Sequence, residues 1–476
     1  MACLAGVHQA AATGKTVFPI ATNVSLFELS SGIAYDGTNY LVGMTVGTNV
    51  VGQLVSSNGT LVGPQIIVGS NPGFPPTIAL AFGQTNYLVA WSDSTISSGV
   101  DMFGQFISRS GAKVGSSFNL LQSQGSHGIQ FVYALASDGT NFLVTWADST
   151  NSATQTSGSF YGQLVTPAGT LSGPEFLISS QHQNGNSMSA AFGKTNYLVI
   201  WQSNNNDTGL DNKTYGEFVS SSGSTGSPFQ ISQTASTDQN PLTIAFDGTN
   251  YLAVWPWDIG TGFGAVTNWD LHGRLVSPTG TFPGSELNLV TDPGSQSFPS
   301  LAFDGANYLL TWSDSPNGAT LSGTNANIRF QFFNRSGSAI GSEFTFFPSQ
   351  GTNGPLLAFN GLLFDGTRFV MAATLGTVTT DTNGDITGIP SSEVFGAFIP
   401  ASTTPPTLAT TGSLIGTQFP LLLTGTPGIN YAIQVSTNLT LSNWTALTTN
   451  SPTTGTFSFT DTSATNKSRF YRAMKQ

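Results

Sequence analysis

Charged residues and cysteine are scarce in this sequence, and each shortage excludes a class of protein. Only 8% of the 476 residues are charged, against roughly a quarter in an ordinary globular domain. The net charge is -11 and no basic run occurs before residue 400, so nucleic acid is not an expected partner. The single cysteine, Cys3, excludes an intrachain disulfide. No apolar stretch is long enough to span a membrane, and the Gly-, Ser-, Thr- and Asn-rich remainder is typical of an extracellular or cell-surface β-protein.

Recognisable catalytic signatures are also missing. The sequence contains no Gly-x-Ser-x-Gly, no His-Glu-x-x-His and no nucleotide-binding loop. His127, His182 and His272 fall in three different repeats, and nothing in the sequence brings them into metal-ligand spacing. We therefore expect no catalytic residue and treat the protein as a non-enzyme.

Seven tandem repeats organise residues 16–400. Each contains a phrase such as FDGTNYLAVW at 246–255, followed by a second phrase such as YGQLV at 161–165. The asparagine of the first phrase recurs as Asn39, Asn86, Asn141, Asn196, Asn250 and Asn307, and Arg368 takes its place in the last copy. The intervals of 47, 55, 55, 54, 57 and 61 residues indicate one supersecondary unit stacked on copies of itself.

Each repeat reads as four short antiparallel strands. In the fifth repeat the apolar runs are 242–246, 251–255, 271–276 and 286–290, and they alternate with a period of two. Asp-Gly-Thr-Asn joins the first two runs and Ser-Pro-Thr-Gly the last two, which are turn sequences. Four strands in about 55 residues predict a propeller blade.

The two ends of the array predict that it closes. The seventh repeat stops after its third strand at 394–400, and a segment that matches the missing fourth strand lies at 17–22. Pairing of these segments closes a seven-bladed β-propeller and leaves no open edge. The predicted organisation is an N-terminal tail at 1–15, the propeller at 16–400, a linker at 401–406 and a small β-sandwich at 407–476.

The C-terminal module differs from the propeller in charge. Its only acid is Asp461, whereas four basic residues lie in its last ten positions: Lys467, Arg469, Arg472 and Lys475. A basic end on an acidic body predicts an assembly interface that docks head to tail with a neighbouring copy. The alternative is a solvated strand edge whose charges prevent aggregation.

The loops between second and third strands vary most, from 7 to 22 residues, and they make one face of the propeller the candidate binding surface. The fifth-repeat loop places aromatic rings beside carboxylates, a combination that suits stacking on sugars. Its candidate ligand-binding residues are Trp257, Asp258, Phe263, Trp269 and Asp270. The alternative is that these rings fold back and pack the loop. By contrast, Trp91, Trp146, Trp201, Trp255 and Trp312 recur at one repeat position and are expected to be structural.

The longest loop contains a second candidate site. Asp381, Asn383 and Asp385 place oxygen ligands at alternate positions, as in a structural calcium loop. Ile386, however, stands where such loops carry glycine, so a turn built on Asn-Gly is the alternative. No other cofactor is expected.

The repeat phrases resemble propeller repeats found in large secreted and surface proteins of bacteria. The C-terminal phrases IQVSTN at 433–438 and RFYRA at 469–473 are similar to fibronectin-like modules that attach or sort such proteins. Ala373 in place of the repeat tryptophan and Phe330 in place of the glycine depart from the pattern. The resemblance implies the propeller fold and an extracellular location, and no chemistry.

These observations favour a non-catalytic binding or adhesion scaffold that contacts a glycan or a surface protein through its variable loops. The alternative is a self-assembling subunit of an extracellular filament or surface layer, joined through the basic C-terminal module. A glycan-active enzyme is the third interpretation.

Overall fold

The computed structural model divides into two compact units. It describes residues 16–21, 28–70, 78–93, 101–121, 130–148, 158–182, 187–204, 212–234, 242–258, 269–315, 327–347, 360–380, 386–401, 407–425, 431–437, 444–450, 456–464 and 469–475. The large unit comprises Met1–Asp365 and Phe369–Ile399, and the small unit comprises Pro400–Gln476 with Gly366–Arg368. The described residues are all-β, and no helix among them could span a membrane.

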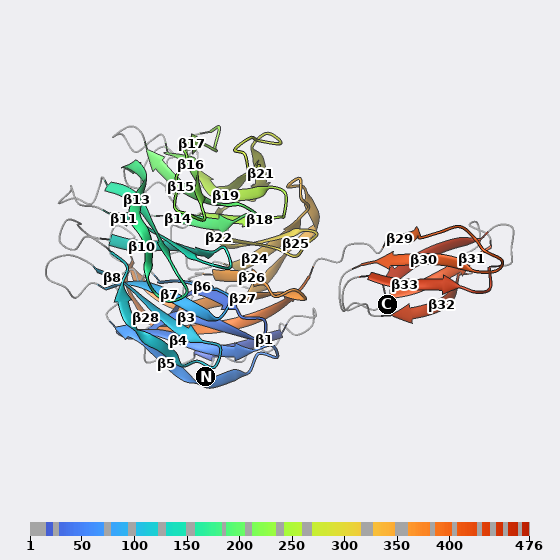
Figure 1. Cartoon of the computed structure of the whole chain (residues 1–476), viewed down its shortest axis with the longest axis horizontal. Helices are drawn as coiled ribbons and strands as arrows, with labels where there is room; N and C mark the ends of the chain where they lie inside the picture. The colour runs from blue at the N-terminus through green and yellow to red at the C-terminus, as the bar shows by residue number, and fades with distance from the viewer. Residues whose placement is uncertain are drawn as a thin grey trace. The chain divides into compact units, whose positions relative to one another are not determined.

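Seven four-stranded antiparallel sheets form the described part of the large unit (Figure 1). Sheet 1 contains β2 (Glu28–Tyr35), β3 (Asn39–Val46), β4 (Asn49–Ser56) and β5 (Leu61–Ser70). Sheet 2 contains β6 (Ile78–Phe82), β7 (Asn86–Asp93), β8 (Asp101–Ser108) and β9 (Lys113–Asn119). Sheet 3 contains β10 (Gln130–Ser137), β11 (Phe142–Asp148), β12 (Gly158–Val165) and β13 (Leu171–His182). Sheet 4 contains β14 (Met188–Phe192), β15 (Asn196–Asn204), β16 (Asn212–Ser220) and β17 (Phe229–Gln230).

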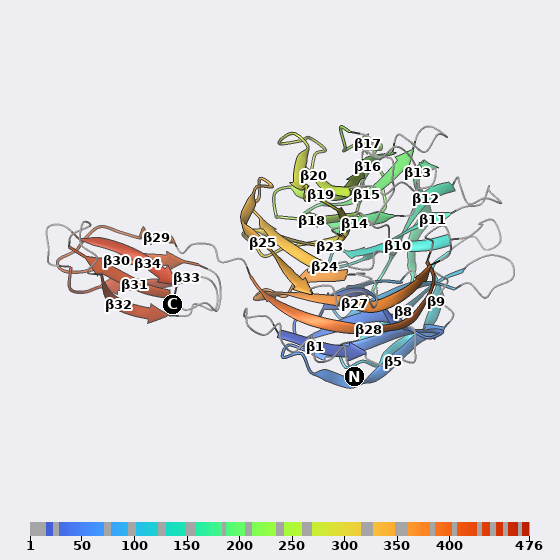
Figure 2. The same ribbon diagram turned by 180° about the vertical axis from the view of Figure 1, so that it is seen from behind.

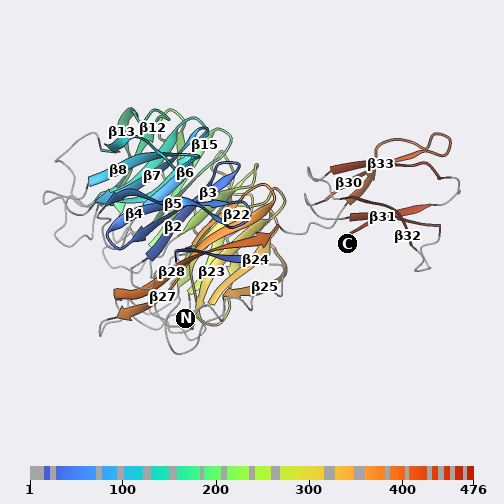
Figure 3. The same ribbon diagram turned by 90° about the horizontal axis from the view of Figure 1, so that it is seen from below.

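The remaining three sheets follow the same order along the chain, with one exception in sheet 7. Sheet 5 contains β18 (Thr243–Phe246), β19 (Tyr251–Asp258), β20 (Trp269–Val276) and β21 (Leu287–Val290). Sheet 6 contains β22 (Ser295–Phe303), β23 (Tyr308–Ser315), β24 (Asn327–Phe333) and β25 (Ala339–Phe347). Sheet 7 contains β26 (Asn360–Phe364), β27 (Arg368–Thr380), β28 (Ile386–Pro400) and the N-terminal β1 (Thr16–Ala21). The sheets are arranged like propeller blades (Figure 3).

The N-terminal strand supplies the outer strand of sheet 7, as the sequence predicts. β1 runs antiparallel to β28, with Thr16 opposite Phe398 and Phe18 opposite Gly396 (Figure 2). The Phe18 ring lies directly over Gly396, where a Cβ atom would collide with it. The ring also contacts Phe398 at a centroid distance of 4.8 Å. The absence of a side chain at Gly396 therefore allows this pairing.

The repeated turns position each sheet and tie it to the next. In sheet 1, Asp36 accepts hydrogen bonds from the backbone N–H groups of Thr38 and Asn39, both at 2.7 Å. Gly37, which lies between Asp36 and Thr38, has a φ of +92°, a conformation that glycine adopts without strain. The Tyr87 hydroxyl of sheet 2 then donates to the carbonyl oxygen of Asn39 at 2.8 Å. The repeated phrase thus encodes both a hairpin and a link between sheets.

The core of the large unit lies between neighbouring sheets. Among the described residues, seven apolar clusters each combine side chains of two successive sheets. One of them joins Val370 and Val394 of sheet 7 to Tyr40 of sheet 1. The repeated tryptophans of the second strands are buried in these clusters, which confirms their structural role: Trp91, Trp146, Trp201, Trp255 and Trp312.

The small unit contains two three-stranded sheets around one core. The first comprises β29 (Thr407–Thr410), β30 (Phe419–Thr424) and β33 (Thr456–Asp461). The second comprises β32 (Thr445–Asn450), β31 (Tyr431–Ser436) and β34 (Phe470–Lys475). Leu421 and Leu423 of β30 meet Tyr431 and Ile433 of β31 in the shared apolar cluster.

Candidate functional site

Two positions on the third strand distinguish sheets 4, 5 and 6 from the other sheets. They flank the repeat glycine (Phe330 in sheet 6), and we call them position A, before it, and position B, after it. Position A holds Val51, Phe103, Tyr161, Tyr215, His272, Arg329 and Phe395 in sheets 1 to 7. Position B holds Gln53, Gln105, Gln163, Glu217, Arg274, Gln331 and Ala397. Position A is therefore basic in sheets 5 and 6 alone, and position B is charged in sheets 4 and 5 alone.

Elsewhere these two positions have structural roles. At position A, Phe103 stacks on Trp91 with ring centroids 5.8 Å apart, and Tyr161 stacks on Trp146 at 5.9 Å. At position B, the Gln163 amide donates to backbone carbonyls of its own and the adjacent strand, at 2.9 and 3.2 Å. The residues that depart from this pattern in sheets 4 to 6 are His272 and Arg329 at position A and Glu217 and Arg274 at position B.

His272 replaces the packing aromatic in sheet 5 and is held by two contacts. Its ring stacks on Trp257, with centroids 4.5 Å apart and an interplanar angle of 22°. Its Nδ1 lies 2.9 Å from Oε1 of Glu286, and both side chains are over nine-tenths buried. Nε2 of His272 has no hydrogen-bond partner among the described residues. The imidazole is thus oriented by Nδ1, whereas the buried Nε2 is left without a partner among the described residues.

Glu286 is ionised in this setting. Burial alone would raise the pKa of its carboxyl, but hydrogen bonds from His272, Thr234 and Gln233 outweigh burial and lower the pKa. The Gln233 backbone N–H and the Thr234 hydroxyl both donate to the carboxylate at 2.5 Å. Because an ionised carboxylate only accepts hydrogen bonds, Nδ1 of His272 carries the hydrogen in their contact.

The predicted loop carboxylates lie next to this histidine on paired strands. The sequence placed 257–270 in a loop, but β19 extends to Asp258 and β20 begins at Trp269, and these two residues face each other in the sheet. Trp257 pairs with Asp270 in the same register. Burial raises the pKa of Asp270, and the nearby Asp292 and Asp258 carboxylates raise it further, whereas His272 opposes them.

Trp269 and Asp258 are buried, whereas a ligand-binding role on an exposed loop would require them to be accessible. For Trp269 this fits the alternative that the rings pack the loop. Trp269 is 6% exposed and Asp258 is 3% exposed. The extended β-ladder gives both residues a place in the sheet, so Trp269 packs instead of presenting its ring to solvent. Trp257 remains partly exposed beside His272. Phe263 lies outside the described residues.

Arg329 occupies position A of sheet 6 and forms ion pairs with three acidic side chains. Its guanidinium lies 3.1 Å from Asp292 and 3.2 Å from Asp314, and it also pairs with Glu343. Burial raises the pKa of Glu343 to about 7, a hydrogen bond with Asp292 adds to the shift, and Arg329 opposes it. Asp292 therefore interacts electrostatically with Asp270 of sheet 5 as well as with Arg329 of sheet 6.

These side chains form two groups, one in contact with His272 and one in contact with Arg329, and Asp270 interacts electrostatically with His272 of the first and Asp292 of the second. We call the two groups together the polar cluster of sheets 5 and 6. The cluster comprises Trp257, Asp258, Asp270, His272, Glu286, Asp292, Asp314, Arg329 and Glu343. It combines a partly exposed aromatic ring, carboxyl oxygens and one imidazole nitrogen without a partner among the described residues. This set can donate and accept hydrogen bonds around an apolar face.

The sequence identified Trp257, Asp258 and Asp270 but missed most of their partners. Arg329 and Glu343 come from strands that look ordinary in isolation, and Glu286 directly precedes β21. Aligning the seven third strands would have found His272 and Arg329, because each replaces an apolar residue of the repeat.

The predicted calcium and assembly residues fall partly outside the described residues. Asp381, Asn383, Asp385 and Lys467 lie outside them, as does the side chain of Lys475. Within the described part of the chain, no group of three or more His, Cys, Asp or Glu residues could hold a metal ion.

The remaining basic residues of the C-terminal unit contact their own module. Arg469 Nε lies 2.9 Å from the buried carboxylate of Asp461. Arg472 donates from Nε to the Gln434 side-chain oxygen at 2.8 Å, and its guanidinium lies 4.3 Å from the centroid of the Trp444 ring. Both guanidinium groups therefore already have partners within the module.

No protein-family model and no curated protein matches the chain. Among solved structures, it is similar to a subtype N11 neuraminidase-like protein of A/flat-faced bat/Peru/033/2010 (H18N11), at 10% identity and a TM-score of 0.40, over 81% of this chain and 91% of that one. It is also similar to the parainfluenza virus 5 hemagglutinin-neuraminidase ectodomain, at 9% identity and a TM-score of 0.42, over 81% of this chain and 82% of that one. A prolyl endopeptidase matches at 10% identity and a TM-score of 0.42, over 84% of this chain and 54% of its own length. Likeness of this degree assigns no activity to the chain.

Proposed function

We propose that this chain is a non-catalytic extracellular binding protein, and that a glycan binds at the polar cluster of sheets 5 and 6. The observation that carries the proposal is that a basic residue stands at position A in sheets 5 and 6 alone, as His272 and Arg329, where the other five sheets carry an aromatic residue or valine. Replacement of the packing residue at the same position of two adjacent repeats favours a role for this position in contact with another molecule.

The chemistry of the cluster suits a polyhydroxylated ligand. The Trp257 ring offers an apolar face of the kind on which sugar rings stack. The Asp270 carboxyl beside it can accept hydrogen bonds from hydroxyl groups, and Nε2 of His272 can accept one because Nδ1 carries the ring hydrogen. Stacking and directional hydrogen bonds together distinguish a sugar from a purely apolar ligand.

The scaffold included in this proposal is a closed seven-bladed propeller followed by a small β-sandwich. The pairing of β1 with β28 and the apolar cluster between sheets 7 and 1 support closure. A closed ring holds the strand ends of sheets 5 and 6 in fixed positions, so the binding site is preorganised.

Binding is favoured over self-assembly because Arg469 and Arg472 are engaged within their own module. An assembly contact through these side chains would have to replace existing interactions. A secreted or surface location accords with the low charge and the repeat phrases, and fractionation of the source cells would test it.

The test is a glycan array probed with the full chain, followed by calorimetric titration of any glycan that binds. His272→Tyr installs the residue that sheets 3 and 4 carry at position A, so the variant is expected to fold. We expect it to weaken binding about tenfold or more through loss of the imidazole contact. Phe103→Tyr, at position A of sheet 2, is the matched control and should leave affinity unchanged.

Three results would overturn the proposal. Unchanged affinity for the glycan in His272→Tyr would show that the glycan does not bind at His272 of sheet 5. Turnover of the bound glycan would identify an enzyme. Salt-sensitive polymers, together with no binding on the array, would favour the assembly alternative.

A further inference from the structure

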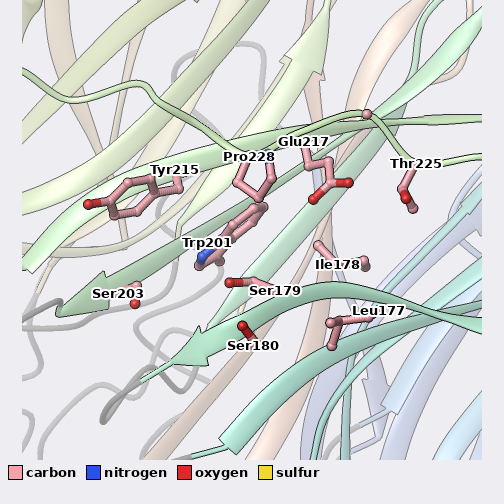
Figure 4. Close-up of a pocket in the computed structure, with 11 residues that line it drawn as sticks. Leu177, Ile178, Ser179, Ser180, Trp201, Ser203, Tyr215, Glu217, Thr225 and Pro228 are labelled. Carbon is pink, nitrogen blue, oxygen red and sulfur yellow. The ribbon is translucent and has the colours of Figure 1, made fainter.

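A second site lies away from the polar cluster, in a pocket between sheets 3 and 4. The pocket has a volume of about 390 Å³. Glu217 and Thr225 line it from sheet 4, and Ile178 and Ser179 line it from the facing strand β13 (Figure 4). The Trp201 and Tyr215 rings complete the lining and stack on each other, with centroids 6.3 Å apart.

This pocket coincides with a change at position B. Four other sheets carry glutamine there, and each amide donates to a carbonyl of the adjacent outer strand: Gln53, Gln105, Gln163 and Gln331. In these sheets the outer strand contains a glycine with a φ near +70°: Gly63, Gly115, Gly173 and Gly341. Sheet 4 has Glu217 instead, and an ionised carboxylate cannot donate to a carbonyl.

The segment between the turn glycine and the phenylalanine of the outer strand is also one residue shorter in sheet 4. In sheet 3, Phe176 follows the turn glycine Gly169 by seven positions. In sheet 4, the equivalent Phe229 follows Gly223 by only six. Both phenylalanines pair with the repeat glycine of their third strand, so the deletion falls between the turn and this pair. The deletion therefore changes the outer-strand segment that accepts the glutamine hydrogen bond in the other sheets. In sheet 4 this segment lines the pocket.

These two changes leave a buried carboxyl facing the pocket. Glu217 is 2% exposed, and its Oε2 has no hydrogen-bond partner among the described residues. It is also the only charged side chain among the described residues that line the pocket. Burial raises the pKa of Glu217 to about 7, and a hydrogen bond with Thr225 opposes the shift. A buried carboxylate without a cation is costly, so a positively charged ligand would relieve an existing penalty.

We propose that this pocket binds a small organic cation, an amine or a methylated ammonium. Its positive charge would pair with Glu217, and its alkyl groups would contact the Trp201 and Tyr215 rings. A carboxylate beside aromatic rings is a combination that recognises ammonium groups. The volume lies in the range of pockets that enclose small molecules. This site is separate from the polar cluster and does not depend on the function proposed for it.

The experiment is calorimetric titration of the full chain with methylammonium and with tetramethylammonium, using glycerol as the neutral probe. We expect binding of one or both cations at pH 8 and about 30-fold weaker binding at pH 5.5. A carboxyl with a pKa of about 7 is about 90% ionised at the higher pH and about 3% at the lower. Glu217→Gln should abolish binding at both pH values, and it should fold because glutamine is the usual residue of position B.

A matched variant separates the pocket from a general effect of charge. Glu393→Gln removes another buried carboxyl whose pKa is raised by burial, in sheet 7. It should leave the affinity for the cations unchanged. Equal affinity in Glu217→Gln and the wild-type chain, binding that is independent of pH, or binding of glycerol in preference to both cations would each overturn the proposal.

Discussion

The buried Glu217 carboxyl should make the large unit less stable at neutral pH than at mildly acidic pH, and glutamine should remove that loss. Burial raises the pKa of Glu217 from 4.5 to about 7 in the folded chain. Between these two values the folded state retains a proton that the unfolded state has released. The free energy of unfolding therefore falls as pH rises from about 4.5 to about 7, and this contribution is constant above that range.

The size of the effect follows from the pKa shift. The pKa rises from 4.5 to about 7 and each pKa unit corresponds to about 1.4 kcal/mol, so ionisation of the buried carboxyl costs at most about 3.5 kcal/mol. Because the carboxyl lines a pocket that solvent can enter, we discount this to about 2 kcal/mol. Glu217→Gln should accordingly unfold with the same free energy at pH 5 and pH 8, as far as this group is concerned.

Urea unfolding at pH 5 and pH 8 measures this difference. All tryptophans except Trp444 lie in the large unit, so their fluorescence reports mainly on it. Glu343 also has a pKa of about 7 in the folded chain, but it is present in both proteins and cancels in the comparison. If the wild type and Glu217→Gln lose the same free energy between pH 5 and pH 8, then Glu217 does not carry an elevated pKa and the reasoning fails.

Three further predictions concern the scaffold. Phe18→Ala should destabilise the large unit by about 3 kcal/mol or more, because the ring is 8% exposed and packs against Phe398; a urea midpoint equal to that of the wild type would show that β1 contributes little. Asp138→Ala removes two backbone hydrogen bonds of 2.7 and 2.6 Å in a hairpin turn and should cost about 1 to 2 kcal/mol by the same assay, whereas no loss would make the turn independent of its carboxylate. The pKa of Asp461 is lowered, since hydrogen bonds and Arg469 outweigh its burial, so the small unit should lose stability as pH falls below about 4. Hydrogen exchange of β29 to β34, followed by mass spectrometry of the full chain at decreasing pH, would detect this loss, which Asp461→Asn should not show; identical acid sensitivity in both proteins would contradict it.

Much of the scaffold could be predicted because its determinants are local and repeated. A turn such as 36–39 needs only an acid that accepts two backbone hydrogen bonds and a glycine that adopts positive φ. The alternation of apolar residues then places each second strand in the core. The partner of β1 could be predicted because one repeat lacks a strand that its own sequence cannot supply.

The candidate site was less predictable because its residues depend on register and on distant strands. Trp269 resembled an exposed loop aromatic, but pairing with Asp258 continues the sheet beyond the alternating segment and buries the ring. Glu286 directly precedes the outer strand β21, and the pairing of β21 with β20 shifts register between Leu271 and His272. The contact between Glu286 and His272 depends on this pairing. Prediction of the Glu217 pocket would have required two changes to be considered together: the substitution of glutamine by Glu217 and the single-residue deletion before the neighbouring outer strand. Neither change is informative alone.

The pairing of β1 with β28 also determines how the large unit should respond to mechanical force. Thr16 lies opposite Phe398 at one end of an antiparallel ladder, so both chain ends of the unit leave the same end of the same pair of strands. A load applied through these ends would break the interstrand hydrogen bonds one after another, as in a zipper, and not all at once in shear. The unit should therefore open first at sheet 7 and at low force, while the other six sheets keep their structure until the N-terminal strand has peeled away.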